Sequence, residues 1–290
     1  MNMKPKITPI RELMSQYDVL LLDAYGVLVN GKGSLPYAKE FVNHLEETKK
    51  DYLIVTNNAS SSTYAIAKSF EKNSLLIPQE KILSSGSLLS PWIRENFKND
   101  SPRVLFMGSL ESQGLLQEAF CHITNVKDYK ENSLENYDVL VICTQEEKDF
   151  RLNFEKLMSY LFQAEERNSF PQIILPNPDL IYPKDEKNFG IVSGMIAYML
   201  EGALRLRFPR KIFKIEALGK PGSYIFEKAK DKFPGKKLLM VGDQIETDVK
   251  GAHKAGIHSA LMLGGVVCEK SLDGEGAYQP RFLLENLKVL

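Results

Sequence analysis

The sequence predicts an α/β protein: a Rossmann-like, doubly wound parallel sheet into which a second, smaller α/β domain is inserted. Short apolar runs alternate with segments of helical periodicity, an order that favours parallel strands with helices on both faces. This pattern loosens midway along the chain and later resumes. With 290 residues, of which 43% are hydrophobic, the chain is long enough for two domains and apolar enough for a sizeable core.

The first strand is expected at residues 19–22, an apolar run that ends abruptly in Asp23. Its carboxyl end would present Asp23 to the crevice in which open α/β sheets carry their chemistry. Gly26 allows a sharp backbone turn just after it. A helix around residues 36–45, a strand over 51–58 and a helix over 60–75 complete a βαβα order, which predicts a parallel sheet.

A domain boundary is expected around residues 84–87, where serine and glycine loosen the chain. The inserted domain ends at residues 176–179, where two prolines stiffen the connection. We therefore assign residues 86–179 to the inserted domain and residues 1–85 plus 180–290 to a discontinuous main domain. Within the insertion we expect strands at 103–108, 138–143 and 172–175, and helices at 114–120 and 150–167.

After the insertion, the main pattern resumes with a helix over residues 190–208 and a strand over 212–218. Lys220 follows this strand, and we expect the strand to continue the first sheet. A helix over 222–232, a strand ending in Gly242-Asp243, a helix ending at Gly256 and a strand over 257–263 follow.

Polar side chains stand at the carboxyl ends of four expected strands. They are Asp23, Thr56-Asn57-Asn58, Lys220 and Asp243. Such ends meet at one edge of a parallel sheet. Carboxylates that meet there repel unless a cation lies between them, and oxygen ligands favour Mg²⁺. A lysine keeps a nucleophilic carboxylate ionised, while a threonine hydroxyl and backbone N–H groups suit phosphate oxygens. The set predicts phosphoryl transfer through an aspartyl-phosphate.

These motifs resemble those of the haloacid dehalogenase superfamily. They are Asp23-x-Tyr-Gly-Val-Leu, Thr56-Asn-Asn, Gly219-Lys220-Pro221 and Gly242-Asp243-x₄-Asp248. The insertion, which would be a cap domain, and Asn177-Pro178-Asp179 resemble its class IIA branch of nitrophenyl-phosphatase, ribonucleotide-monophosphatase and pyridoxal-phosphatase types.

The resemblance implies a role for each residue. Asp23 would be the nucleophile and a Mg²⁺ ligand, together with the Tyr25 backbone carbonyl and Asp243, while Asp248 steadies the metal's shell. Thr56, Asn57 and Asn58 would bind phosphate, and Lys220 would bridge Asp23 and the phosphate. For Asn177 and Asp179, an interdomain turn and a substrate contact both remain open.

Tyr25 departs from the pattern, because phosphatases of the superfamily carry a second aspartate two residues after the nucleophile. That aspartate protonates the leaving oxygen and later activates water, which is worth about 10²–10⁴-fold in rate. Tyrosine, with a pKa of about 10, is a poor substitute near neutral pH. We expect slow turnover of sugar or nucleotide phosphates and a smaller penalty for aryl or acyl phosphates.

Two alternatives follow from Tyr25. One is a regulatory protein that binds a phosphorylated metabolite without hydrolysing it. The other is an L-2-haloacid dehalogenase, because the Asp-Ala-Tyr-Gly stretch resembles the first motif of those metal-free enzymes. Retention of Asp243 and Asp248 favours the metal-dependent phosphatase.

The composition of the chain limits the kinds of molecule that we expect it to bind. Lys+Arg and Asp+Glu both number 37, so no basic field attracts nucleic acid or anionic membranes. Three scattered cysteines, the lack of an apolar signal core in residues 1–18 and the lack of a membrane-spanning run favour a cytoplasmic protein. The expected partner is a small phosphorylated metabolite, and a homo-oligomer remains open.

Overall fold

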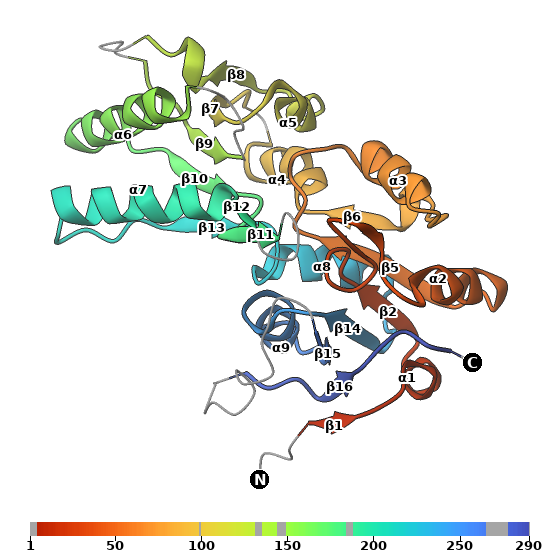
Figure 1. Ribbon diagram of the computed structural model, residues 1–290. Helices are drawn as coiled ribbons and strands as arrows, with labels where there is room; N and C mark the ends of the chain where they lie inside the picture. The colour runs from red at the N-terminus through yellow and green to blue at the C-terminus, as the bar shows by residue number, and fades with distance from the viewer. Residues whose placement is uncertain are drawn as a thin grey trace.

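The computed structural model describes residues 5–98, 100–130, 135–143, 149–183, 188–264 and 278–289. Within these residues, two parallel sheets organise the chain (Figure 1). The larger sheet has seven described strands in the order β1-β16-β15-β14-β2-β5-β6. Their bounds are β1 (Lys6–Ile7), β2 (Val19–Leu22), β5 (Asp51–Thr56), β6 (Ile82–Ser84), β14 (Leu238–Gly242), β15 (His258–Met262) and β16 (Phe282–Leu284).

The central strand β2 is buried along its whole length between β14 and β5. Its alternate residues point to opposite faces: Leu20 and Leu22 join one apolar cluster, whereas Val19 and Leu21 join another. The first cluster includes residues of α1 (Ile10–Gln16), α2 (Ala38–Glu47) and α3 (Thr63–Lys72). The second includes residues of α4 (Leu89–Asn96), α8 (Ser223–Lys232) and α9 (Lys250–Lys254). Helices therefore cover both faces, which confirms the doubly wound prediction.

The smaller sheet has five described strands in the order β13-β10-β9-β7-β8, all paired in parallel. The long helices α6 (Phe150–Glu166) and α7 (Ser193–Arg207) lie side by side against one face (Figure 1). The other face contributes Val104, Phe106 and Val141 to the cluster that contains α4 and α8. The two sheets therefore share a core. The strands are β7 (Arg103–Met107), β8 (His122–Asn125), β9 (Val139–Ile142), β10 (Gln172–Leu175) and β13 (Ile215–Ala217), and α5 spans Leu110–Gln113.

One strand prediction is wrong. The strand expected at residues 212–218 is β13, and it pairs with β10 of the smaller sheet, with Ile173 opposite Ile215. The reason is local: α7 packs on the smaller sheet, and the next strand pairs with the strand before the crossover helix. A division into two domains stays a prediction, and this pairing favours a second boundary after β13 rather than at residue 180.

Two short antiparallel hairpins complete the described fold. One joins β3 (Val29–Asn30) to β4 (Gly33–Ser34), shortly after Asp23. The other joins β11 (Ile181–Pro183) to β12 (Phe189–Ile191), shortly after Asp179. No helix within the described part of the chain is both long and apolar enough to cross a membrane.

Candidate active site

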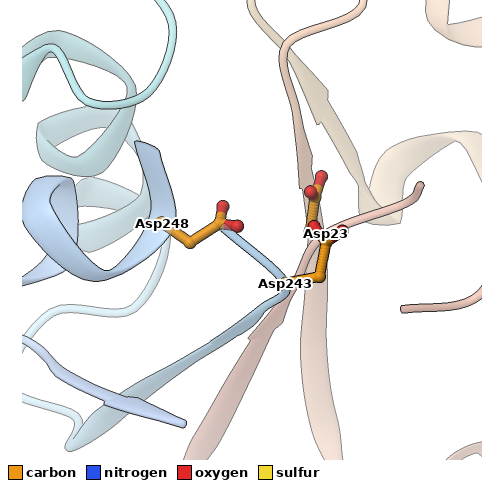
Figure 2. A group of neighbouring side chains, drawn as sticks. All are labelled: Asp23, Asp243 and Asp248. Carbon is orange, nitrogen blue, oxygen red and sulfur yellow. The ribbon is translucent and has the colours of Figure 1, made fainter. Parts of the chain in front are cut away.

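Three aspartates meet at the carboxyl edge of the larger sheet. Asp23 follows β2, Asp243 follows the neighbouring β14, and Asp248 lies in the helical turn Ile245–Val249. One carboxylate oxygen from each lies within 4.8 Å of the others. Figure 2 shows Asp248 reaching toward Asp23 and Asp243 from its turn. All three residues are buried, so the cluster concentrates negative charge away from water.

Lys220 is in direct contact with two of these carboxylates. Its Nζ lies 2.7 Å from Asp23 Oδ1 and 2.7 Å from Asp248 Oδ1, and the residue is 1% exposed. Burial alone lowers the pKa of Lys220, but Asp23 and Asp248 raise it further than burial lowers it. Lys220 is therefore protonated. It reaches the cluster from a loop after β13 of the smaller sheet, so its predicted position is correct although its predicted sheet is not.

The other two carboxylates still repel the charge on Asp23 beside Lys220. Burial raises the pKa of Asp23, Lys220 opposes the rise, and Asp248 and Asp243 add to it. A divalent cation would remove this repulsion, and closely spaced carboxylate oxygens are the donors that Mg²⁺ and similar hard cations take. The residues present therefore fit a metal site.

Two glycines make room for the carboxylates. Gly26 has a φ of +80°, and a Cβ there would overlap the Asp243 carboxylate. At Gly242, a Cβ would overlap the Asp248 carboxylate. Glycine is thus required at Gly26 both by its left-handed backbone and by the close approach of the acid.

The Asn57 side chain holds the Lys220 main chain in place. Lys220 N donates to Asn57 Oδ1 at 2.7 Å, and Asn57 Nδ2 donates to Lys220 O at 2.8 Å. The same Nδ2 donates to Asp179 Oδ1 at 3.0 Å. Because the side-chain amide of Asn57 is already hydrogen-bonded to Lys220 and Asp179, only its backbone N–H is suited to donate a hydrogen bond to a phosphate. These hydrogen bonds of the Asn57 side chain to Lys220 and Asp179, which we call the Asn57 bracket, join the tip of β5 to loops that follow β10 and β13.

A cleft of about 700 Å³ opens above the cluster. It is lined by every predicted site residue except the fully buried Asp248: Asp23, Tyr25, Thr56, Asn57, Asn58, Asn177, Asp179, Lys220 and Asp243. The Tyr25 side chain is 46% exposed. The structure therefore brings the sequence-predicted residues to one site.

Asn177 and Asp179 form the expected turn and also lie at the cleft, while their contact with a substrate stays a prediction. Asn177 Oδ1 accepts a hydrogen bond from Asp179 N at 2.9 Å, which closes a side-chain turn. Both residues also line the cleft. Burial raises the pKa of Asp179 to about 6, against the opposing effects of Lys220 and the Asn57 hydrogen bond. Asp179 therefore takes part in a turn, accepts a hydrogen bond from Asn57 and lines the cleft.

Sequence reasoning missed the apolar side chains that the β11–β12 hairpin adds to the lining. Ile181, Tyr182, Phe189 and Val192 come from the β11–β12 hairpin and its flank. No motif marks them. The available signal was their position directly after the Asn177–Asp179 connection, which was already a candidate contact.

Two family models match the chain and together cover more than half of it. A model of haloacid dehalogenase-like hydrolases matches residues 20–122, and a HAD-hydrolase-like model matches residues 217–290. The chain belongs to the haloacid dehalogenase superfamily. The matched segments contain Asp23, Thr56, Lys220, Asp243 and Asp248.

Relatives along nearly the whole chain place this hydrolase among the class IIA phosphatases. The 4-nitrophenylphosphatase of Schizosaccharomyces pombe is 25% identical, over 97% of this chain and 95% of the relative. Chronophin of Rattus norvegicus is 26% identical, over 93% and 82%. A solved structure of a possible sugar phosphatase from Cytophaga hutchinsonii is 28% identical, covers 98% of both chains and superposes with a TM-score of 0.84. The branch predicted from the motifs is confirmed.

Proposed function

We propose that the protein is a Mg²⁺-dependent phosphatase that hydrolyses a small phosphorylated metabolite through an aspartyl-phosphate on Asp23. The observation that carries this proposal is the contact of Lys220 with Asp23 and Asp248 beside Asp243, at the floor of a cleft. The relatives that are named as phosphatases support the same reaction class.

Asp23, Asp243 and the Tyr25 carbonyl would hold the ion, with Asp248 steadying the set. A bound Mg²⁺ would neutralise the acidic cluster and the oxygens of the phosphoryl group. Lys220 would add a second positive charge on the Asp23 side, since its Nζ already contacts Asp23 Oδ1. The Thr56 hydroxyl and the backbone N–H of Asn57 would bind phosphate oxygens at the tip of β5.

The reaction would run in two displacements. An Asp23 oxygen attacks phosphorus, the bond from phosphorus to the leaving oxygen breaks, and the leaving oxygen takes a proton from solvent. Water then attacks the aspartyl-phosphate, gives up a proton to solvent, and releases inorganic phosphate and the Asp23 carboxylate. Tyr25 supplies neither proton transfer efficiently, so both steps would be slow for poor leaving groups.

A panel of phosphate esters assayed with and without Mg²⁺ tests the proposal. We expect Mg²⁺-dependent release of phosphate, fastest from aryl and acyl phosphates. If the native protein is inactive on the whole panel while Tyr25→Asp becomes active, the native protein is not a phosphatase but its site can support one.

A binding protein without turnover is the second candidate, and the exposed Tyr25 at the cleft favours it. Retention of a phosphorylated metabolite at nanomolar affinity without hydrolysis would support this candidate, and fast hydrolysis would exclude it. The haloacid dehalogenase alternative predicts chloride release from 2-chloropropionate without metal. The buried carboxylate cluster argues against that alternative.

A further inference from the structure

Because Tyr25 transfers protons poorly, the proposed reaction needs another proton carrier. Among the described residues that line the cleft, the carboxyl groups belong to Asp23, Asp179 and Asp243, with no glutamate, histidine or cysteine. Asp23 would be the nucleophile and Asp243 a metal ligand. Tyrosine and lysine side chains, the other titratable groups of this lining, exchange protons poorly near neutral pH. Within the described lining, this leaves Asp179 as the carboxyl group to which the proposed reaction gives no role.

The main chain around Asp179 is held in place by its own turn and by the start of α7. Asp179 N donates to Asn177 Oδ1 at 2.9 Å, and Gly194 N donates to Asp179 O at 3.0 Å. Ser193 Oγ donates to Asn177 O at 2.9 Å. A Cβ on Gly194 would lie 2.3 Å from Asp179 O, so α7 packs directly against this peptide. These contacts fix the place from which the Asp179 carboxyl group meets the cleft.

The carboxyl group of Asp179 is one hydrogen bond away from Asn57, which stands at the expected phosphate position. Asn57 Nδ2 donates to Asp179 Oδ1 at 3.0 Å, and the backbone N–H of the same residue would bind a phosphate oxygen. An ester whose phosphate lies between Asn57 and Asp23 extends its leaving oxygen into the cleft, where Asp179 forms part of the lining. The bond from Asn57 engages Oδ1, so Oδ2 can carry a proton toward that oxygen.

The surroundings of Asp179 favour a carboxyl group that exchanges a proton near neutral pH. Burial raises the pKa of Asp179 to about 6, Asp248 adds to the rise, and Lys220 and the hydrogen bond from Asn57 oppose it. The contacts from the start of α7 are an uncharged N–H and a hydroxyl group. Among the described residues of the β11–β12 hairpin, the titratable side chain at the cleft is that of Tyr182. A pKa close to the working pH is what general acid–base catalysis requires.

We propose that Asp179 is the general acid–base catalyst of this site, in the part that Tyr25 performs poorly. The inference rests on the proposed function and names a protein group for the protons that would otherwise be exchanged with solvent. The Asp179 O–H bond breaks as the bond from phosphorus to the leaving oxygen breaks, and the proton bonds to that oxygen. The Asp179 carboxylate then takes a proton from the water that attacks phosphorus and displaces Asp23, which restores the acid.

Turnover of poor leaving groups should therefore rise toward acid pH. The proton-donating form of Asp179 is present below about pH 6 and is lost as pH rises through 6. At pH 7, about a tenth of the molecules would still carry this proton. Activity near neutral pH would thus stay low for such substrates, in agreement with the slow turnover expected from Tyr25.

Two substrates of similar size but with different leaving groups separate proton donation from binding. Steady-state kinetics in Mg²⁺ would compare benzyl phosphate, whose alkoxide needs a proton to leave, with 4-nitrophenyl phosphate, whose phenolate does not. In native protein, the ratio of kcat/KM for benzyl phosphate to kcat/KM for 4-nitrophenyl phosphate should fall about tenfold from pH 7 to pH 8. At about pH 6, Asp179→Asn should lower kcat/KM at least about 10²-fold for benzyl phosphate and less than about fivefold for 4-nitrophenyl phosphate.

Ser193→Ala is the matched control, because it removes the hydrogen bond to Asn177 O and keeps the Asp179 carboxyl group. It should change kcat/KM for the two substrates by the same factor and leave the pH dependence of their ratio unchanged. A ratio that is the same in native and Asp179→Asn protein, or that falls equally in Ser193→Ala, would overturn the inference while the proposed function stands. A native protein that releases phosphate from neither substrate would overturn both.

Discussion

Tyr25 is the residue on which turnover depends. It lines the cleft two residues after Asp23 and is half exposed, so an aspartate fits there without disturbing the core. We predict that Tyr25→Asp raises kcat for alkyl phosphates by about 10²-fold through general acid–base catalysis. The kcat for 4-nitrophenyl phosphate, whose leaving group needs no proton, should change by less than about tenfold. Steady-state kinetics would measure both, and an equal gain for both substrates would contradict the role given to this position.

Asp179 should make stability depend on pH. Its pKa is raised from 3.8 to about 6 by burial, so the folded protein binds more protons than the unfolded chain between these values. The stabilising contribution of the protonated carboxyl is therefore present below about pH 4 and lost as pH rises through 6. Asp179→Asn keeps an oxygen that accepts from Asn57 Nδ2 but cannot ionise.

We predict that Asp179→Asn gains stability relative to the native protein as pH rises. The free energy of unfolding of the variant minus that of the native protein should be about 1–3 kcal/mol larger at pH 8 than at pH 4. Urea denaturation at the two pH values measures this difference. The same difference at both values would mean that Asp179 does not titrate as its burial implies.

At the scale of elements, the turn after β2 is shaped around the acid of the neighbouring strand. We predict that Gly26→Ala abolishes stabilisation by Mg²⁺ and lowers stability by about 2–4 kcal/mol, because of its positive φ and the overlap with the Asp243 carboxylate. Gly235 is the matched control, since its φ is +73° and a Cβ there would meet open space. Gly235→Ala should cost only about 1 kcal/mol and keep the Mg²⁺ response in thermal unfolding. Equal effects of the two substitutions would contradict this account.

The strands that carry the acids could be predicted from sequence, whereas the sheet that receives β13 could not. β2 and β14 are apolar runs that end in aspartate, and their burial on both faces leaves this signature in the residues. β13 has the same local pattern whichever sheet it joins. Its pairing depends on α7 packing against the smaller sheet, a tertiary contact that no motif records.

Some features of the site could likewise be predicted from sequence, whereas others could not. Asp23, Lys220 and Asp243 were predictable because each stands directly after a strand or within a motif. The hydrogen bonds of the Asn57 side chain to Lys220 and Asp179 span more than a hundred residues of chain, so they became visible only in the folded structure. The apolar side chains that the β11–β12 hairpin adds to the cleft had no motif at all.

At the scale of the whole molecule, the Asn57 bracket ties the two sheets together at the site. Asn57→Ala would leave the buried N–H and C=O of Lys220 without their side-chain partner. We predict a loss of about 2–4 kcal/mol in stability and a fall of at least about 10²-fold in kcat, because Lys220 loses its fixed position. Asn58→Ala, which removes bonds in a more accessible loop, should cost less than about 1 kcal/mol in the same denaturation experiment. Equal stability losses would show that the bracket is not a special link.

The central claim is that Asp23 performs Mg²⁺-dependent phosphate hydrolysis. The most direct test measures phosphate release from 4-nitrophenyl phosphate by the native protein and by Asp23→Asn. Each protein is assayed once with Mg²⁺ and once with EDTA. We predict release by the native protein in Mg²⁺ and background rates in the other three conditions. Activity that survives EDTA or the Asp23→Asn substitution, or a native protein that releases no phosphate in Mg²⁺, would contradict the claim.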